Sequence, residues 1–225
     1  MEIRNLTYTF PRSKDPFFRD LNFTIADNEI NFLVGRNGVG KTTLIDVILG
    51  LRQAKLKIDK TFSYVYINQT LPMLGSITVG EIANLVLGIE YGKYEIELGY
   101  LKDKIEEYSF SFLQKRWNKH YQELSGGERK LVQLVLFLQI KRDLVVLDEP
   151  TAFLDRENVN NVFHVINANK DRTYLIITHD VRDLLLVNDY HLLSMDNHKI
   201  DHEFNKKTFE NVNRDNSFLH YFAEV

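Results

Sequence analysis

Residues 35–43 combine glycine, lysine and threonine at a spacing that can hold a chain of phosphates. The glycines let the backbone curl and point its N–H groups at an anion, and the helix expected next offers that anion its positive dipole end. The lysine can reach the β- and γ-phosphates, and the first threonine hydroxyl can ligate Mg²⁺. The sequence therefore predicts a nucleoside triphosphate site formed by Gly35, Arg36, Asn37, Gly38, Val39, Gly40, Lys41, Thr42 and Thr43.

Two acidic residues follow a second apolar run further along the chain. Residues 144–147 have the composition of a strand buried on both faces, and Asp148 and Glu149 come next. Open α/β sheets bind ligands at the carboxyl ends of their strands. We expect Asp148 to hold Mg²⁺, directly or through a water, and Glu149 to polarise a water aimed at the γ-phosphate. The alternative is that the two acids form the solvated start of a loop.

The segment Leu-Ser-Gly-Gly-Glu at residues 124–128 stands before an expected helix. Its serine, followed three residues later by glutamate, fits a capping box that any helix can use. Its two glycines also fit an exposed helix amino terminus that binds an anion. At this level both interpretations stay open.

Apolar strands and amphipathic helices alternate along most of the chain. We expect strands at 2–8, 21–25, 30–34, 61–67, 144–147, 174–177 and 191–195, and helices at 41–49, 79–87, 95–117, 128–140, 156–168 and 180–187. This alternation predicts an α/β fold with a mostly parallel sheet. Residues 75–123 carry helical spacing with few strand signals, which indicates a helical lobe inserted into a core made of residues 1–74 and 124–225.

The order of these elements resembles the ATP-binding cassette ATPases over nearly the whole chain. Residues 35–42 resemble the family's Walker A loop, and residues 144–149 its Walker B strand. Residues 124–128 match the LSGGE form of the family signature, which is far more specific than a Walker A loop alone. The resemblance implies one cassette domain over residues 1–225, with a P-loop NTPase core, a small antiparallel β lobe and the helical lobe.

Further roles are implied by this resemblance alone. Gln69 is similar to the family's Q-loop glutamine, which contacts Mg²⁺ and water, and His179 resembles the switch histidine at the γ-phosphate. Asp155 falls in the D-loop, at an expected dimer interface. Phe10 occupies the place of the aromatic residue that stacks on adenine, with Tyr8 as the competing candidate. The expected catalytic residues are thus Lys41, Gln69, Glu149 and His179, and the expected Mg²⁺ ligands are Thr42, Gln69 and Asp148.

The resemblance also implies a partner of the same kind. The signature of a second cassette is expected to close over the γ-phosphate, with Ser125 and the amides of Gly126 and Gly127 as donors. Because neither half-site alone surrounds the transferred phosphoryl group, hydrolysis should need a head-to-tail dimer, formed by two copies or by related chains.

Three departures from the family pattern concern parts outside the phosphate contacts. Gln69 follows Lys41 by only about 28 residues, which predicts a trimmed β lobe. The helix after the signature carries Leu131, Val135 and Phe137 where relatives have an arginine and small residues, which suggests altered packing and slower turnover. Residues 141–143 replace a proline-containing turn.

Composition narrows the function classes. The net charge of −3 lacks the basic excess that nucleic-acid binding usually needs, and the absence of cysteine excludes disulfides and thiolate metal sites. No signal peptide is evident at the amino terminus, and the apolar stretch at 131–140 is about half of a bilayer span. We therefore do not expect the chain to cross a membrane by itself.

The leading hypothesis is a cytoplasmic ATPase subunit that powers a membrane transporter. Separate permease subunits would hold it at the inner face of the cell membrane, and the helical lobe would receive them. Export of peptides or drugs is favoured over nutrient import. The alternative is an ATPase that acts on ribosomes or DNA without transport. A kinase or GTPase does not explain residues 124–128 or His179.

Overall fold

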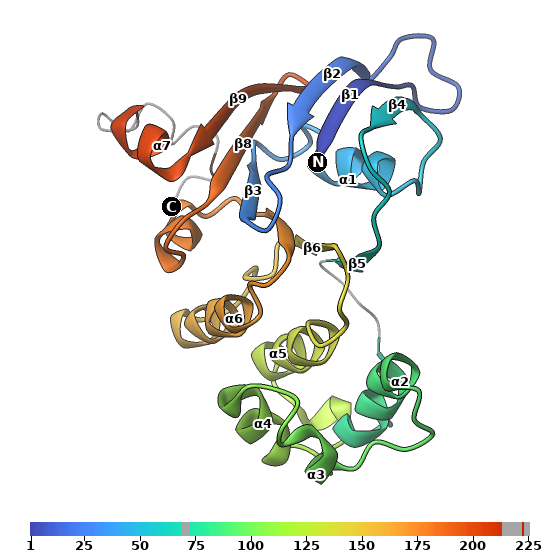
Figure 1. The fold of residues 1–225 in the computed structure, drawn as a ribbon, viewed down its shortest axis with the longest axis vertical. Coiled ribbons are helices and arrows are strands. Elements are labelled where there is room, and N and C mark those ends of the chain that lie inside the picture. Colours follow the sequence, from blue (N-terminus) through green and yellow to red (C-terminus); the bar gives the residue numbers. More distant parts are fainter. Residues whose placement is uncertain (69–72, 213–221, 223–225) are drawn as a thin grey trace. The chain divides into compact units, whose positions relative to one another are not determined.

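The chain divides into two compact units. The computed structural model describes residues 1–68, 73–212 and 222 (Figure 1). The first unit comprises Met1–Tyr66, Asp143–Glu149 and Lys170–Val225, and the second comprises Ile67–Arg142 and Pro150–Asn169. Each unit is described below by itself.

The first unit contains a six-stranded sheet in the order β5-β6-β7-β3-β8-β9. Neighbouring strands from β6 to β8 run parallel, and β9 pairs antiparallel with β8. Every residue of β3, β6 and β7 is buried, as expected for apolar strands covered on both faces. The strands are β3 (Ile30–Val34), β5 (Tyr64–Ile67), β6 (Leu144–Asp148), β7 (Thr173–Ile177), β8 (His191–Asp196) and β9 (Lys199–Asn205).

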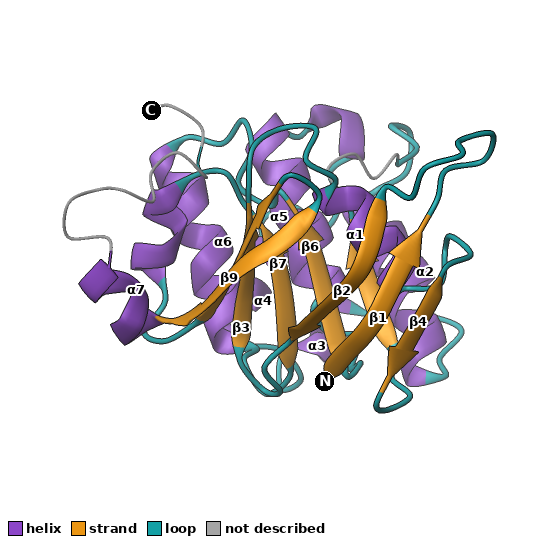
Figure 2. Ribbon diagram, turned by 90° about the horizontal axis from the view of Figure 1, so that it is seen from above, coloured by secondary structure: helices purple, strands orange, loops and turns teal. Residues whose placement is uncertain are grey.

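A three-stranded antiparallel sheet completes the first unit (Figure 2). Its order is β2-β1-β4, with β1 at Glu2–Tyr8, β2 at Phe18–Thr24 and β4 at Lys55–Ile58. Helix α1 (Lys41–Ile48) shares one apolar core with both sheets. The α/β class, the mostly parallel sheet and the small antiparallel lobe are all confirmed. Strand β4 was not expected, because four alternating residues give little pattern to detect.

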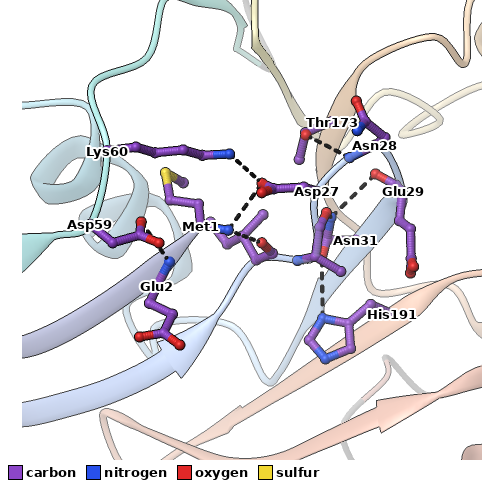
Figure 3. Close-up of polar contacts among 12 residues, drawn as sticks. Met1, Glu2, Asp27, Asn28, Glu29, Asn31, Asp59, Lys60, Thr173 and His191 are labelled. Carbon is purple, nitrogen blue, oxygen red and sulfur yellow. Dashed lines mark hydrogen bonds and ion pairs between the residues drawn. The ribbon is translucent and has the colours of Figure 1, made fainter.

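A buried asparagine fixes the start of β3, the strand that leads to the phosphate loop. Asn31 is fully buried, and its Nδ2 donates to the backbone oxygens of Ala26, Glu29 and Tyr174. Its Oδ1 accepts from the Ala26 amide and lies 3.0 Å from Nδ1 of His191, at the start of β8 (Figure 3). A buried amide with all its partners resists displacement, so this residue holds β3 in register between β7 and β8.

Three cationic and anionic groups lie beside this asparagine. The carboxylate of Asp27 accepts from Nζ of Lys60 at 2.6 Å and from the amino group of Met1 at 3.0 Å (Figure 3). The hydrogen bond from Lys60, followed by that from the amino group, lowers the pKa of Asp27. The contact between the Met1 amino group and Asp27 connects the start of β1 to the turn before β3.

The second unit is helical. Helix α5 (Gly126–Phe137) packs against both α2 (Val79–Tyr91) and α6 (Arg156–Ala168). Shorter elements are α3 (Leu98–Leu101), α4 (Glu107–Gln114) and the 3₁₀ turn η1 (Tyr121–Glu123). The lobe expected at residues 75–123 lies within this unit, and its boundary stays a prediction. Among the described residues, no helix is both long and apolar enough to span a bilayer.

Several expected elements differ from those observed. The single helix expected at 95–117 is two short helices, because Glu106 starts α4 by accepting from the amides of Tyr108 and Ser109. The segment at 180–187 is a 3₁₀ turn, η2 (Val181–Leu186), since a buried bond from Thr178 Oγ1 to Asp183 draws it back toward β7. The polar tail forms β9 and α7 (Lys206–Val212), neither of which was expected.

Candidate nucleotide site

The phosphate loop joins β3 to α1 in the first unit. Gly40 is the N-cap of α1, with a φ of 108° and no side chain to cap the helix. A Cβ on Gly40 would lie 2.6 Å from Cε1 of Phe17, so both its backbone angle and its surroundings require glycine. The first amides of α1 have no partner within the helix, which leaves them for an anion.

Lys41 points back along this loop. Its Nζ donates to the carbonyl oxygens of Gly35 at 2.5 Å and Arg36 at 3.2 Å. The side chain is buried, and this burial lowers its pKa, while Glu149 and Asp148 act in the opposite direction. Nearby carboxylates thus favour the charged ammonium that a phosphate chain needs.

The end of β6 brings an acidic group to the same loop. Oδ2 of Asp148 accepts from Oγ1 of Thr42 at 3.1 Å and from the phenol of Tyr66 at 3.3 Å. Burial raises the pKa of Asp148 and that of Tyr66. The expected pair of Mg²⁺ ligands, Thr42 and Asp148, therefore converges. Tyr66 was not identified from the sequence, where it was one of several aromatic residues in a strand.

The oxygens here suit Mg²⁺. A threonine hydroxyl and a buried carboxylate are hard donors, and Mg²⁺ sites commonly use one or two such groups with waters and substrate phosphates. The described residues include no cluster of three His, Cys, Asp or Glu side chains that could hold a metal alone. The donors present fit an ion that shares its coordination with a nucleotide.

Glu149 and His179 lie at the ends of adjacent strands. The Glu149 amide donates to Ile177 at the end of β7, and Oε1 of Glu149 lies 3.3 Å from Nδ1 of His179. This second contact lacks the geometry of an aligned hydrogen bond, and Nδ1 has no hydrogen-bond partner among the described residues. Glu149 also has a φ of 50°, which costs a non-glycine residue about 1–3 kcal/mol and is typical of functional sites.

Lys41, Thr42, Asp148 and Glu149 line one cavity of about 370 Å³ in the first unit, a size suited to a small ligand, whereas His179 and Tyr66 lie outside its lining. Of the described loop residues, Gly35, Arg36 and Val39 lie outside its lining, and the lining adds two residues that the sequence did not indicate, Phe17 and Ile177. The complete lining is Phe10, Phe17, Asn37, Gly38, Gly40, Lys41, Thr42, Thr43, Asp148, Glu149 and Ile177.

The aromatic side of the cavity favours Phe10 over Tyr8 as the contact for a base. Phe10 lines the cavity, whereas Tyr8 is 3% exposed and belongs to the core. The Phe10 and Phe17 rings meet edge to face at 4.9 Å between centroids. Phe17 precedes β2 by one residue, in a turn-rich stretch that gave no periodic signal. Gln69 lies outside the described residues.

The signature segment lies in the second unit at the start of α5. Ser125 is the N-cap, and its Oγ accepts from the Glu128 amide while Glu128 Oε2 accepts from the Ser125 amide. The capping box is therefore formed, and Ser125 and Gly126 are exposed beside it. Glu128 also accepts from Arg116 Nε at 2.8 Å. Capping accounts for Ser125 and Glu128 but not for the two glycines between them.

The D-loop segment precedes α6 in the same unit. Asp155 is the N-cap of α6 and accepts from the Asn158 amide at 2.9 Å. Phe153, two residues earlier, is 97% exposed with a φ of 63°. Its positive φ is uncommon for a residue other than glycine.

The first unit therefore has the fold and the site of a phosphate-loop nucleotide-binding protein. A family model described as "ABC transporter" matches residues 18–152, more than half of the chain. The chain belongs to this family.

Individual relatives and solved structures support the same family assignment. The chain is 30% identical over 203 residues to the lipoprotein-releasing system ATP-binding protein LolD of Buchnera aphidicola, covering 79% of this chain and 86% of that protein. It is 27% identical to the zinc import ATP-binding protein ZnuC of Pasteurella multocida, covering 100% and 82%. A solved ADP conformation of an ATP-binding cassette of an ABC transporter matches with a TM-score of 0.71 and 25% identity, covering 97% and 95%. The chain is thus an ATP-binding subunit of the ABC transporter family, with ATPase activity.

Proposed function

We propose that the cavity beside α1 is the ATP site, and that Glu149 activates the attacking water. The observation that carries this proposal is the convergence of Lys41, Thr42, Asp148 and Glu149 on one cavity. Lys41 and the α1 amides bind the β- and γ-phosphates, and Thr42 with Asp148 would hold Mg²⁺, which would neutralise charge on the phosphates. Glu149 accepts the water proton, and His179 orients that carboxylate and contacts the γ-phosphate.

The proposed ATP site is completed by a second cassette. Ser125, Gly126 and Gly127 of one copy would donate to the γ-phosphate held by the other, so that water is excluded only in the dimer. The exposed Phe153 and the neighbouring Asp155 support a contact at this place, because an unpaired aromatic side chain gains free energy when a partner buries it.

We further propose that permease subunits dock on the second unit. One face of α2 is buried, whereas Leu85 and Ile89 on the opposite face are 63% and 86% exposed, and Tyr94 beyond the helix is fully exposed. Residues four apart share one side of a helix, so Leu85 and Ile89 form an apolar strip. Such a docked subunit would hold the chain at the inner face of the cell membrane.

For the direction of transport we propose export. The Buchnera relative is named for lipoprotein release, which fits export better than uptake, whereas the Pasteurella relative is named for zinc import. Cells that carry the inactive Glu149→Gln variant should retain the cargo. A loss of uptake in those cells would contradict export.

Glu149→Gln tests the proposed chemistry. The variant should bind ATP, lose turnover and accumulate an ATP-bound dimer, because the amide keeps the shape of the carboxylate but cannot accept a proton. Light scattering with and without ATP reports the dimer, and phosphate release reports turnover. Wild-type turnover in this variant would contradict the role of Glu149.

Pull-down from solubilised membranes tests the docking. Co-purification of a multi-span protein supports the transporter, and its loss with Leu85→Ser plus Ile89→Ser locates the surface. Leu185→Ser serves as the matched control, because Leu185 lies in the first unit and its exposure is between those of Leu85 and Ile89. A soluble ATPase recovered with ribosomes or DNA would reject transport.

A further inference from the structure

We propose that His198 is a positioning residue for the phosphate loop. It lies in the turn between β8 and β9, outside every segment assigned above to the nucleotide. The strands pair Asp196 with Lys199, which leaves Asn197 and His198 as a two-residue hairpin turn. Their φ angles are 46° and 61°, the left-handed values of a type I′ turn.

Glycine is the residue that the backbone at position 198 favours. A type I′ turn favours asparagine followed by glycine, because glycine alone adopts a positive φ without steric cost. Asparagine and histidine are among the non-glycine residues that enter this region most often, but each has a steric cost there that glycine lacks. Strain of this kind persists where the surrounding contacts impose it, so the contacts of the ring are informative.

Among the described residues, the ring makes one polar contact, and that contact is to the phosphate loop. Nδ1 of His198 lies 2.8 Å from the carbonyl oxygen of Val39. A carbonyl can only accept, so Nδ1 carries the hydrogen. Val39 stands between Gly38 and Gly40, both of which line the cavity. The bond therefore fixes the loop at the last peptide before the N-cap of α1.

The same ring supports the loop through an aromatic neighbour. The centroids of His198 and Phe17 are 4.0 Å apart, with an interplanar angle of 39°. The Phe17 ring in turn presses on Gly40, where a Cβ would come within 2.6 Å of Cε1. Two routes thus lead from His198 to the loop, one through Val39 and one through Phe17 to Gly40.

Strand β8 holds the other end of the loop. A Cβ on Gly35 would lie 2.4 Å from the carbonyl oxygen of Met195, so the loop starts in close contact with the backbone of β8. The β8 strand and its turn therefore brace the loop at Gly35 and again at Val39. A loop held in its binding conformation loses less entropy when a phosphate chain binds, which strengthens binding without altering the chemical step.

Three substitutions separate the two contacts of His198. His198→Asn keeps an N–H at the position of Nδ1 but removes the ring. His198→Phe keeps a ring but removes the donor, and His198→Gly removes both. Asn197→Gly is the matched control, because it relieves the positive φ of the adjacent turn position without touching the loop. None of these residues has been placed in the catalytic machinery.

The measurements are the Kd for ATP of the full chain, kcat and KM, and the Tm without nucleotide. We expect His198→Gly to weaken ATP binding about threefold to tenfold, the loss of one hydrogen bond, and to raise KM with little change in kcat. Because the hydrogen bond to Val39 is the stronger of the two contacts, His198→Phe should bind only slightly better than His198→Gly, and His198→Asn should recover most of the affinity. Asn197→Gly should bind as the wild type does.

Three results would overturn the proposal. One is an unchanged Kd in His198→Gly, and another is an asparagine variant that binds no better than the glycine variant. The third is a weaker Kd in His198→Gly accompanied by a fall in Tm without nucleotide, which would assign a general structural role. We expect that Tm to stay level or rise, because glycine relieves the strained φ.

Discussion

The helices α1 and α5 begin in opposite ways. Gly40 gives α1 an N-cap without a side chain and no acidic residue in its first turn. Ser125 gives α5 a complete capping box, with Glu128 in the first turn and Arg116 paired to it. One helix terminus is open to an anion, and the other already has a hydrogen-bonded carboxylate.

This difference suggests that the two helix termini have different functions. The open end of α1 can bind phosphates by itself, with Lys41 beside it. The capped end of α5 is stable without a ligand and carries a negative charge, so it gains little from an anion unless a partner places one there. We infer that α1 governs affinity and α5 governs assembly, and the following variants test this distinction.

The largest effect is expected at the open terminus. Lys41→Ala should weaken ATP binding by about 10–100-fold and lower turnover by roughly a further 100-fold, because a charge-assisted contact to the phosphates is lost. Isothermal titration and phosphate release measure the two losses. Lys57→Ala, an exposed lysine on β4, is the control. A nearly normal Kd for ATP in Lys41→Ala would contradict the inference that the α1 terminus governs ATP affinity.

A selective effect is expected at the capped terminus. Ser125→Ala should leave the Kd for ATP of the isolated chain unchanged but lower turnover by about 100-fold, because a γ-phosphate donor is missing in the dimer. It should also destabilise α5 by about 1 kcal/mol through the lost cap. Weaker ATP binding by this variant in its monomeric form would contradict the proposed role.

These two termini also show what the sequence could predict. The phosphate loop and β3 were located correctly, because glycine spacing and a continuous apolar run are strong local signals. The hydrogen bonds of the buried Asn31 were not foreseen, since its partners Tyr174 and His191 come from strands distant in the sequence. His198 and Phe17 were missed for the same reason: only the packed fold brings a hairpin turn and a loop residue against Val39 and Gly40.

The helical unit was harder to predict. Residues 95–117 read as one amphipathic helix because a glutamate, Glu106, serves as the N-cap of α4 in place of the more common serine or aspartate. The β9 strand alternates exposed and half-buried residues. Without a clear apolar face, its pairing with β8 decides its conformation.

The smallest expected effect concerns the acid in the α5 cap. Hydrogen bonding from the Ser125 amide, then the contact with Arg116, lowers the pKa of Glu128 against burial. A carboxylate with a lowered folded-state pKa stabilises the protein above its ordinary pKa of 4.5, and this stability is lost as pH falls through the folded value. The free energy of unfolding, measured in urea, should therefore fall less in Glu128→Gln than in the wild type as the pH is lowered from about 5. Identical pH profiles of the two proteins would show that the charge of Glu128 does not stabilise the α5 cap.

The central claim is that each copy holds half of an ATP site, and mixing two inactive variants tests it directly. Lys41→Ala keeps an intact signature and Ser125→Ala keeps an intact phosphate loop, so a mixed dimer contains one complete site. In a symmetric dimer, equal mixing gives half mixed dimers with one working site of two, and we predict recovery of about a quarter of wild-type phosphate release. If the mixture releases no more phosphate than the two variants measured separately, a site shared between two copies of this chain is contradicted.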